Sequence, residues 1–425
     1  MNEESIFVQI ASYRDPELVP TILDMFETAE NPDNLHVCIC WQHDEFENLD
    51  IFNTYPNIEI IDVPYQKSKG ACWARNLIQR HYNGERYTLQ IDSHHRFVNG
   101  WDTSLKEMYS QCVSMGSKKP ILTSYVPSFN PLNPKETYEK VPWRMDFYEF
   151  TDEGTVLFVP NQIQDYEKFT SPIPARFYSA HFAFTDGKFC EEVSHDPEYY
   201  FYGEEISITV RAFTHGYDLY HPHKVIIWHE YTREARIKHW DDHDLNKSIK
   251  IDKSWWERDA SSHKRNRVLF GIDNDESIII SPKYQMGTQR SISDYERYAG
   301  INFKDQTISL YTLSGKFAPT PNNQNYVSGK TSSVSIKTLT KTVSIPSKLI
   351  NHQNVSFIKL DLYNKDDKLM ISQSIDKKFI LSLLTKIDPI SISINFDAIE
   401  ETSYYCKLHV YDLFDRIIIQ SVIDI

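Results

Sequence analysis

The sequence predicts an α/β domain with a mostly parallel sheet, followed by a small antiparallel β-sandwich. Within the first 130 residues, short apolar runs alternate with segments whose apolar residues recur at helical spacing. This alternation is typical of a parallel sheet covered by helices on both faces. Beyond residue 330, apolar and polar residues alternate with a period of two, as in half-buried antiparallel strands.

The elements of the α/β part follow from these periods. Short apolar runs predict strands over residues 6–12, 36–41, 58–63, 86–91 and 225–228. Helical spacing predicts helices over residues 16–30, 70–82, 101–115 and 204–215. Residues 127–174, rich in Pro, Asn and aromatics, predict long loops over the sheet. The charged segment 234–267 predicts a lid or tail.

A change in composition separates the two domains. Residues 314–332 are rich in Gly, Pro, Asn and Ser, which predicts a linker or a loop-rich junction. We therefore expect a first domain over residues 1–315 and a β-sandwich accessory domain over residues 330–425.

Composition and charge exclude several classes of function. The formal net charge of -14 argues against nucleic-acid binding, which requires a basic face. The acidic N-terminus lacks the basic and apolar regions of a signal peptide, and no apolar run has the length of a membrane-spanning helix. We expect a cytoplasmic protein, either free or peripheral at the inner face of a membrane. The six scattered cysteines lack zinc-ligand spacing and are expected to be buried free thiols.

Polar residues stand at the carboxyl ends of three expected strands. They are Ser12-Tyr13-Arg14, Gln42-His43-Asp44 and Asp92-Ser93-His94. Open parallel sheets bind ligands at this edge, so the sequence predicts a ligand site there.

The most informative local pattern is LQIDSHHRF at residues 89–97. Asp92 ends an expected strand and His94 follows two positions later, so in an extended segment both side chains point the same way. A carboxylate and an imidazole suit Mn²⁺ or a similar divalent ion. An ordinary Asp-Ser-His turn after a strand has the same sequence, so both interpretations stay open at this level.

Three further groups have both a functional and a plainer explanation. His229 directly follows the strand expected over 225–228 and is either a third metal ligand or a buried residue at a strand end. Glu204 and Glu205 open an expected helix, where acidic side chains also stabilise the helix terminus. Arg75 and Asn76 lie in the first turns of another helix and either hold a sugar or phosphate or face solvent.

Several stretches in a fixed order give the chain a family resemblance over about residues 5–303. They are IFVQIASYRDPEL, KGACWARN, RYTLQIDSHHRF, NGWD, FYGEEISITVRAFTHGYDLY, HEYTR and GTQRSISDYERYAGINF. In them the chain resembles the cytosolic N-acetylglucosaminyltransferases that attach GlcNAc to hydroxyproline on a ubiquitin-ligase adaptor, and their bacterial relatives. It is more distantly similar to the polypeptide N-acetylgalactosaminyltransferases.

The resemblance implies a GT-A (Rossmann-like) fold, a UDP-sugar donor and retention of the anomeric configuration. Asp92 and His94 match the metal motif of the family and His229 its third metal ligand, with Mn²⁺ the expected ion.

The resemblance also assigns residues to the donor and the acceptor. Ser12, Tyr13 and Arg14 match the nucleotide-contacting end of the first strand, and Arg75 and Asn76 the donor-binding helix. Trp101 and Asp102 match the NGWD element. Glu205 falls in the segment that lines the sugar and acceptor side, beside Glu204.

The expected function is the metal-dependent, retaining transfer of GlcNAc from UDP-GlcNAc to an acceptor hydroxyl on a protein or a surface glycan. Either the leaving UDP oxygen accepts the acceptor's proton, or Glu204 or Glu205 acts as a nucleophile. The alternatives are the same chemistry with UDP-GalNAc, UDP-Gal or UDP-Glc, hydrolysis of the nucleotide-sugar, and a non-catalytic carbohydrate-binding protein. The sandwich lies outside the resemblance and is expected to bind the acceptor or a partner chain.

Overall fold

The chain forms two compact units. The computed structural model describes residues 3–232, 236–244, 251–320, 333–346, 355–364, 367, 369–376, 390–399, 404–412 and 416–424. The first unit comprises Met1–Lys304 and Ser309–Ser332, and the second comprises Asp305–Ile308 and Ser333–Ile425. Most of the expected linker, residues 321–332, lies outside the described residues.

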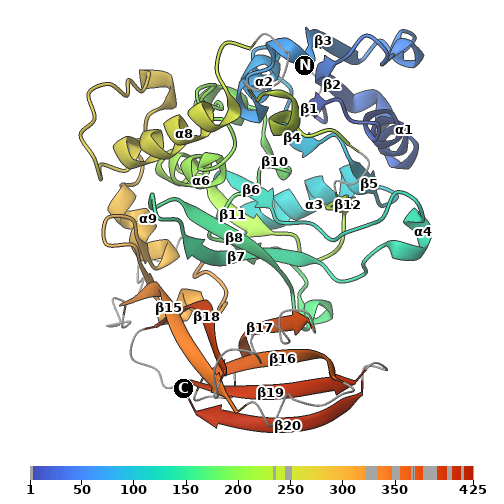
Figure 1. Ribbon diagram of the computed structural model, residues 1–425. Helices are drawn as coiled ribbons and strands as arrows, with labels where there is room; N and C mark the ends of the chain where they lie inside the picture. Colours follow the sequence, from blue (N-terminus) through green and yellow to red (C-terminus); the bar gives the residue numbers. More distant parts are fainter. Residues whose placement is uncertain are drawn as a thin grey trace. The chain divides into compact units, whose positions relative to one another are not determined.

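The first unit is built on an eight-stranded mixed sheet of order β3-β2-β1-β4-β10-β6-β11-β9 (Figure 1). The strands of this unit are β1 (Ile6–Tyr13), β2 (Leu35–His43), β3 (Ile58–Pro64), β4 (Tyr87–Asp92), β5 (His95–Phe97), β6 (Pro120–Thr123), β7 (Trp143–Phe150), β8 (Val156–Gln162), β9 (Ile173–Pro174), β10 (Phe182–Asp186), β11 (Asp218–His221), β12 (Ile227–His229) and β13 (Ile301–Asn302). β1, β2, β3 and β4 are parallel, and β10 runs antiparallel to both β4 and β6. β11 is parallel to β6 and antiparallel to β9. Within the eight-stranded sheet, all strands except β10 and β9 therefore point the same way. The sequence predicts such a mostly parallel sheet.

Helices cover both faces of the sheet. The helices of the first unit are α1 (Leu18–Thr28), α2 (Ala71–Gln79), α3 (Trp101–Ser114), α4 (Pro134–Thr137), α5 (Phe189–Glu192), α6 (Glu204–Thr214), α7 (His239–Asp242), α8 (Trp255–Leu269), α9 (Ile292–Ala299) and α10 (Leu310–Leu313). Alternate residues of β1 show how the faces divide. Ile6, Val8 and Ile10 share a core cluster with apolar residues of α1 and α3, whereas Phe7 packs with residues of α2 such as Ala74. Because side chains alternate across a strand, β1 is buried on both sides.

The ends of β1, β2 and β4 meet at one edge of the sheet. Their last residues are Tyr13, His43 and Asp92. A separate two-stranded ladder lies beyond β4, in which β12 pairs antiparallel with β5 and His229 stands opposite His95. This ladder brings a segment from late in the domain next to the end of β4.

One expectation for the irregular segments is corrected by the structure. Residues 127–174 are not loops throughout, because β7 and β8 pair antiparallel as a hairpin. The alternation within these strands is obscured in the sequence by aromatic residues on both faces. Residues 234–267 contain α7 and most of α8, while residues 245–250 lie outside the described part.

The second unit is an all-β sandwich. Its strands are β14 (Thr307–Ser309), β15 (Ser333–Ile345), β16 (Val355–Asn364), β17 (Leu369–Asp376), β18 (Ile390–Ile399), β19 (Tyr404–Asp412) and β20 (Ile417–Asp424). β15 pairs antiparallel with β18, and a second antiparallel sheet has the order β17-β16-β19-β20. Apolar residues from both sheets, such as Val343, Ile394, Leu360 and Val410, form one core cluster. The period-two pattern of the sequence therefore reflects one buried face per sheet.

Two simple expectations from composition are met by the described residues. All six cysteines are free and buried. No helix in the described part of the chain combines the length and apolar character needed to cross a bilayer.

Replacing Trp101 tests the packing of α3 against the first strands of the sheet. Its side chain is 0% exposed, and its indole N–H donates to Met25 O at 3.0 Å. We expect Trp101→Ala to lower the free energy of unfolding of the first unit by about 3–5 kcal/mol, because it leaves a cavity and removes a hydrogen bond. Urea denaturation is the measurement. The control is Trp256→Ala, at a position 39% exposed, which is expected to change stability by less than about 0.5 kcal/mol. Equal effects of the two substitutions would contradict the assignment of Trp101 to the core.

Candidate metal centre and its pocket

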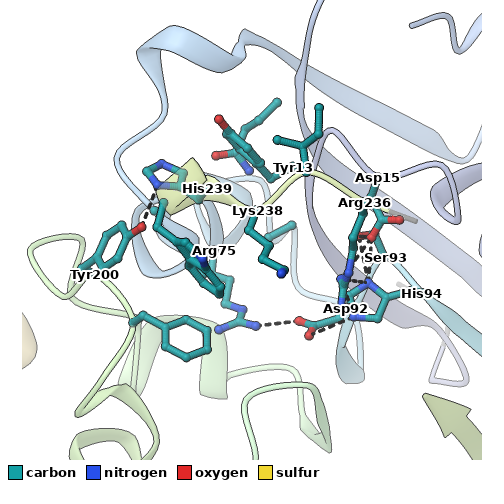
Figure 2. A pocket seen from close by; sticks show the side chains of 17 residues that line it. Tyr13, Asp15, Arg75, Asp92, Ser93, His94, Tyr200, Arg236, Lys238 and His239 are labelled. Atoms are coloured by element: carbon teal, nitrogen blue, oxygen red, sulfur yellow. Dashed lines mark hydrogen bonds and ion pairs between the residues drawn. The ribbon is translucent and has the colours of Figure 1, made fainter. Parts of the chain in front are cut away.

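A pocket of about 800 Å³ opens at the carboxyl ends of β1 and β4, beside the start of α2 (Figure 2). Six segments of the first unit form its wall. Its lining consists of Ala11, Tyr13, Asp15, Gln42, Gly70, Ala71, Arg75, Asp92, Ser93, His94, Tyr200, Phe201 and residues 236–240. The ligand site predicted at this edge of the sheet therefore coincides with a real cavity.

Asp92, His94 and His229 come together at the edge of this pocket, whose wall includes Asp92 and His94. The Oδ2 atom of Asp92 lies 3.7 Å from Nε2 of His94 and 3.5 Å from Nε2 of His229. Two ligand atoms that each bind one ion at about 2.1 Å are separated by at most about 4.2 Å. Both distances from the carboxylate satisfy this limit, so the three side chains fit a common divalent ion.

The backbone fixes each of the three side chains differently. Asp92 is the last residue of β4, whereas Ser93 and His94 form a bend before β5 rather than an extended continuation. His229 ends β12, and its backbone N–H donates to Pro127 O at 2.9 Å. The bend, and not strand alternation as the sequence suggests, turns His94 toward Asp92.

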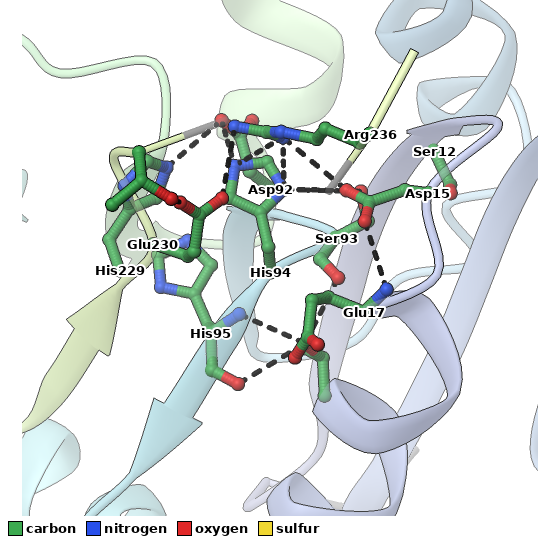
Figure 3. Close-up of polar contacts among 12 residues, drawn as sticks. Ser12, Asp15, Glu17, Asp92, Ser93, His94, His95, His229, Glu230 and Arg236 are labelled. Carbon is green, nitrogen blue, oxygen red and sulfur yellow. Dashed lines mark hydrogen bonds and ion pairs between the residues drawn. The ribbon is translucent and has the colours of Figure 1, made fainter. Parts of the chain in front are cut away.

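Asp15 orients His94. Its Oδ2 atom lies 2.7 Å from Nδ1 of His94 and accepts a 2.7 Å hydrogen bond from the Ser93 hydroxyl (Figure 3). A carboxylate that accepts from one ring nitrogen leaves the other nitrogen with its lone pair toward the ion, as is usual for metal-ligating histidines. Asp15 directly follows the predicted Ser12-Tyr13-Arg14 group, and sequence reasoning missed it.

The charge states of these groups favour metal binding. Burial would raise the pKa of Asp92, but contact with His229 and the charges of Arg75 and His94 lower it well below its usual value. Burial, together with the neighbouring His94, lowers the pKa of His229 well below its usual value. Neither ring nitrogen of buried His229 has a hydrogen-bond partner among the described residues. Asp92 is therefore ionised and His229 neutral, the forms that bind a divalent ion.

Two other clusters of potential ligands in the described residues are less suited to a metal. Cys72, His195 and Glu204 form one, but burial raises the pKa of the Cys72 thiol well above its usual value and Glu204 is paired with Arg75. Cys38, Glu59 and His81 form the other, where burial raises the pKa of the Cys38 thiol in the same direction. Thiols that stay protonated are poor metal ligands.

Arg75 links Asp92 to Glu204. Its Nη2 atom donates to Asp92 Oδ1 at 2.8 Å, and its Nη1 atom donates to Glu204 Oε1. Arg75 and Glu204 are 4% and 3% exposed. Because Arg75 holds Oδ1, the other oxygen of Asp92 is left facing the two histidines. Glu204 lies behind the pocket and not on its wall.

Glu205 points to a different neighbourhood. Its carboxylate accepts hydrogen bonds from Ala180 N and from the Tyr125 hydroxyl, both at 2.9 Å. Burial raises the pKa of Glu205 to about 7, against the lowering effect of these hydrogen bonds. Like Glu204, it is not among the residues that line the pocket.

The residues expected to bind the donor divide into two groups. Tyr13 and Arg75 line the pocket. Arg14, with the left-handed φ of 45°, bridges Asp44 and Asp242 at 2.7 and 2.8 Å. The others lie behind the wall. Ser12 is fully buried, the Asn76 amide donates to His195 O and the Tyr284 hydroxyl, and Trp101 is in the core.

The segment around α7 supplies pocket residues that the sequence did not single out. His239 lies 2.8 Å from the Tyr200 hydroxyl and 2.9 Å from the Ser68 hydroxyl. Tyr13 and Arg14 both donate to Asp242 at 2.8 Å. These contacts hold α7 against the ends of β1 and α2. The only sequence signal is the density of His, Trp and charged residues in this segment.

A second, open groove of about 1550 Å³ lies beside the metal centre. Its wall includes Tyr138, Trp143 and Tyr231, and the rings of Trp143 and Tyr231 stack with centroids 5.9 Å apart. Tyr231 also contacts His229, with ring centroids 4.3 Å apart. The groove therefore begins next to a candidate metal ligand, within the segment predicted to lie over the sheet.

The comparison with protein families decides the class of the chain. The family model described as Glycosyltransferase (GlcNAc) matches residues 5–53 and 48–305. This span includes every pocket residue described above. The chain belongs to the Glycosyltransferase (GlcNAc) family. The predicted glycosyltransferase activity class is therefore confirmed, as is the predicted fold class of a GT-A α/β domain followed by an all-β, sandwich-like domain.

Solved structures of glycosyltransferases are similar to the chain at low identity. GalNAc-T7 with UDP, GalNAc and Mn²⁺ is 13% identical over 69% of this chain, with a TM-score of 0.45, and the match covers 54% of GalNAc-T7. S. aureus TarS 1–349 with UDP-GlcNAc is 11% identical over 66% of this chain and 78% of that one, with a TM-score of 0.36. S. aureus TarS is 9% identical over 99% of this chain and 77% of that one, with a TM-score of 0.35. The chain thus spans about half the length of GalNAc-T7. No curated protein matches the sequence.

Glu205 gives the fold a specific pH dependence. A carboxyl group with a pKa of about 7 when folded and 4.5 when exposed contributes stability fully below pH 4.5 and loses this contribution as the pH rises to 7. At each pH, the free energy of unfolding of Glu205→Gln is compared with that of wild type. We expect this difference to shift in favour of the variant by about 2–3 kcal/mol between pH 4.5 and pH 8. Denaturation curves at several pH values measure this difference.

The matched control is Glu45→Gln, because Glu45 is exposed and forms no ion pair among the described residues. Its stability difference from wild type is expected to stay flat with pH. A flat difference for Glu205→Gln as well would show that Glu205 is ionised in the folded protein like an exposed carboxylate.

Proposed function

We propose that the chain transfers GlcNAc from UDP-GlcNAc to an acceptor hydroxyl, with a divalent ion, Mn²⁺, held by Asp92, His94 and His229. The observation that supports this most is the convergence of these three side chains on the pocket at the end of β4. The description of the family supports GlcNAc as the sugar. In this proposal the acceptor hydroxyl belongs to a protein or a glycan, and the sugar keeps its anomeric configuration.

The bound ion would supply charge stabilisation for the diphosphate leaving group. The residues of the chain do the rest. Arg75 fixes the orientation of Asp92, and Asp15 fixes that of His94. Lys238 reaches into the same space as Arg75 (Figure 2), where its positive charge would pair with a phosphate oxygen. Tyr13 and His239 offer ring faces at the far side of the pocket for the nucleotide base.

We favour the route in which no protein carboxylate attacks the sugar. Glu204 is buried in an ion pair with Arg75, and Glu205 accepts two hydrogen bonds away from the pocket wall. The bond between the anomeric carbon and the phosphate oxygen would break while the acceptor oxygen bonds to the same face of that carbon. The proton of the acceptor hydroxyl would pass to the leaving phosphate oxygen. Positioning and charge stabilisation then account for the rate acceleration.

The acceptor in this proposal enters along the groove beside His229. Tyr138 and Trp143 line that groove together with Glu136 and Asn130. Aromatic faces combined with carboxylate and amide groups can bind a sugar ring and its hydroxyls, or a peptide with a hydroxylated side chain. The resemblance to hydroxyproline-modifying transferases is consistent with the second kind of acceptor.

We further propose that residues 330–425 form an accessory domain that binds the acceptor or a partner chain. In support, the second unit has a core of its own, made by residues of β15–β19. The donor pocket is lined by residues of the first unit.

Thermal unfolding with ligands tests the donor and metal assignment. A ligand that binds only the folded state raises the apparent stability by RT ln(1 + [L]/Kd), about 2.7 kcal/mol at 100 times Kd. We expect Mn²⁺ with UDP-GlcNAc to raise the melting temperature of wild type by a few degrees and to leave that of Asp92→Ala unchanged. The control His81→Ala, at the surface cluster with Glu59, is expected to behave as wild type. A full shift in Asp92→Ala, or a larger shift with another UDP-sugar, would contradict the metal or the donor assignment respectively.

Saturation-transfer NMR tests the acceptor groove. Trp143 stacks on Tyr231 and lines the groove but not the donor pocket. We expect Trp143→Ala to lose the saturation transfer that wild type gives with its binding partners from a panel of oligosaccharides and hydroxyproline peptides. The UDP and Mn²⁺ thermal shift should persist in this variant. If the saturation transfer with Trp143→Ala is unchanged for every panel member that binds, the acceptor site lies outside this groove.

A further inference from the structure

Arg236 lies directly over the candidate metal ligand His94. Its Nη1 atom is 2.5 Å from Nδ1 and 2.7 Å from Nε2 of the imidazole, and 3.3 Å from Oδ2 of Asp15 (Figure 3). Its Nη2 atom is 3.7 Å from Oε2 of Glu230. The guanidinium group is thus centred on the groups that form and orient the metal centre.

The surroundings explain why a cation is held at this place. Asp15 and Glu230 are 5% and 4% exposed, and Asp92 adds a third carboxylate within contact of His94. Buried carboxylates require a nearby positive charge, because removing them from water is costly unless they are paired. Arg236 provides one such charge, and a bound divalent ion would provide another.

The two cations cannot both keep these positions. An ion bound to Nε2 of His94 at about 2.1 Å would lie within about 5 Å of the guanidinium nitrogen that is 2.7 Å from the same atom. A divalent and a monovalent cation at this separation repel strongly in a partly buried site. Binding of the ion therefore requires Arg236 to leave His94, or the repulsion weakens the binding of the ion.

The donor pocket offers Arg236 another partner. Arg236 and Lys238 both line this pocket, in which a nucleoside diphosphate would lie between the ion and the segment at residues 236–240. The negative charge of a diphosphate can pair with the ion and with a displaced guanidinium group at the same time. The diphosphate would then remove the conflict between the two cations.

We propose that Arg236 couples the binding of the divalent ion to the binding of the diphosphate. Without a diphosphate, Arg236 stays in contact with His94 and opposes the binding of the ion. With one, Arg236 moves to the phosphate oxygens and both ligands bind more tightly. This inference rests on the proposed function, because it requires the ion and the diphosphate to share this pocket.

The test measures binding and not turnover. Isothermal titration gives the affinity of wild type, Arg236→Ala and Lys238→Ala for Mn²⁺ alone and for Mn²⁺ in the presence of saturating UDP. The ratio of the two affinities is the coupling factor, which for linked sites is typically about 5–150-fold. Lys238→Ala is the matched control, because Lys238 lines the same pocket but forms no contact with His94 among the described residues.

We expect Arg236→Ala to bind Mn²⁺ alone about tenfold more tightly than wild type and to show a coupling factor reduced by about the same amount, while the direct contact between ion and diphosphate keeps the rest. Lys238→Ala should weaken the binding of UDP without tightening the binding of Mn²⁺ alone. Unchanged or weaker binding of Mn²⁺ alone by Arg236→Ala would overturn the inference, as would the same tightening in Lys238→Ala. If wild type binds no Mn²⁺ even with UDP, the metal centre of the proposed function fails, and the inference fails with it.

Discussion

The ion pairs of Arg75 are the interaction on which the site depends. Arg75 comes from α2, Asp92 from the end of β4 and Glu204 from the start of α6, so one guanidinium group at the pocket wall ties three elements together. Removing one partner of such a buried pair costs about 3–5 kcal/mol, because the remaining charge is left without compensation. The arrangement also determines which oxygen of Asp92 faces the histidines.

The candidate metal centre is assembled from segments that are far apart in the chain. The segment after β1 contributes the neighbouring Asp15, β4 contributes Asp92, and the β12–β5 ladder brings in His229. Each is fixed by its own backbone contacts, so the ligands are positioned before an ion arrives. Such preorganisation lowers the reorganisation needed on binding. The contact of Arg236 with His94 is the exception, since in our proposal this one side chain moves when the ion and the diphosphate bind.

The sequence predicts the fold well because the helical spacing and the period-two alternation of its apolar residues are both clear. Apolar runs identify β1 to β4, and the alternation beyond residue 330 identifies the sandwich strands. It fails for the β7–β8 hairpin, where aromatic residues interrupt the alternation, and for β5, which has only three residues. Short or aromatic strands are defined by their partners in the sheet, and a local pattern cannot show those partners.

The site was predicted only in part for a similar reason. Asp92, His94 and His229 were recognised because a short motif and a family resemblance coincide, and the structure places them together. The interpretation of Trp101 as a donor-binding residue rested on the resemblance, and that of Asn76 also on its place in the first turns of a helix. Both lie behind the pocket wall. Asp15 and Arg236 were missed because their role depends on a contact with His94 across 79 and 142 residues of chain. Long-range contacts of this kind have no signature in a single sequence.

The position of the ion is the most direct test of this account. Crystals grown with Mn²⁺ and UDP would give an anomalous signal from manganese. The account predicts one peak about 2.0–2.3 Å from Asp92 Oδ2, His94 Nε2 and His229 Nε2, in contact with the diphosphate and with Arg236 displaced from His94. A UDP molecule bound in the pocket with no peak at these three residues, or with the peak at another cluster, would contradict it.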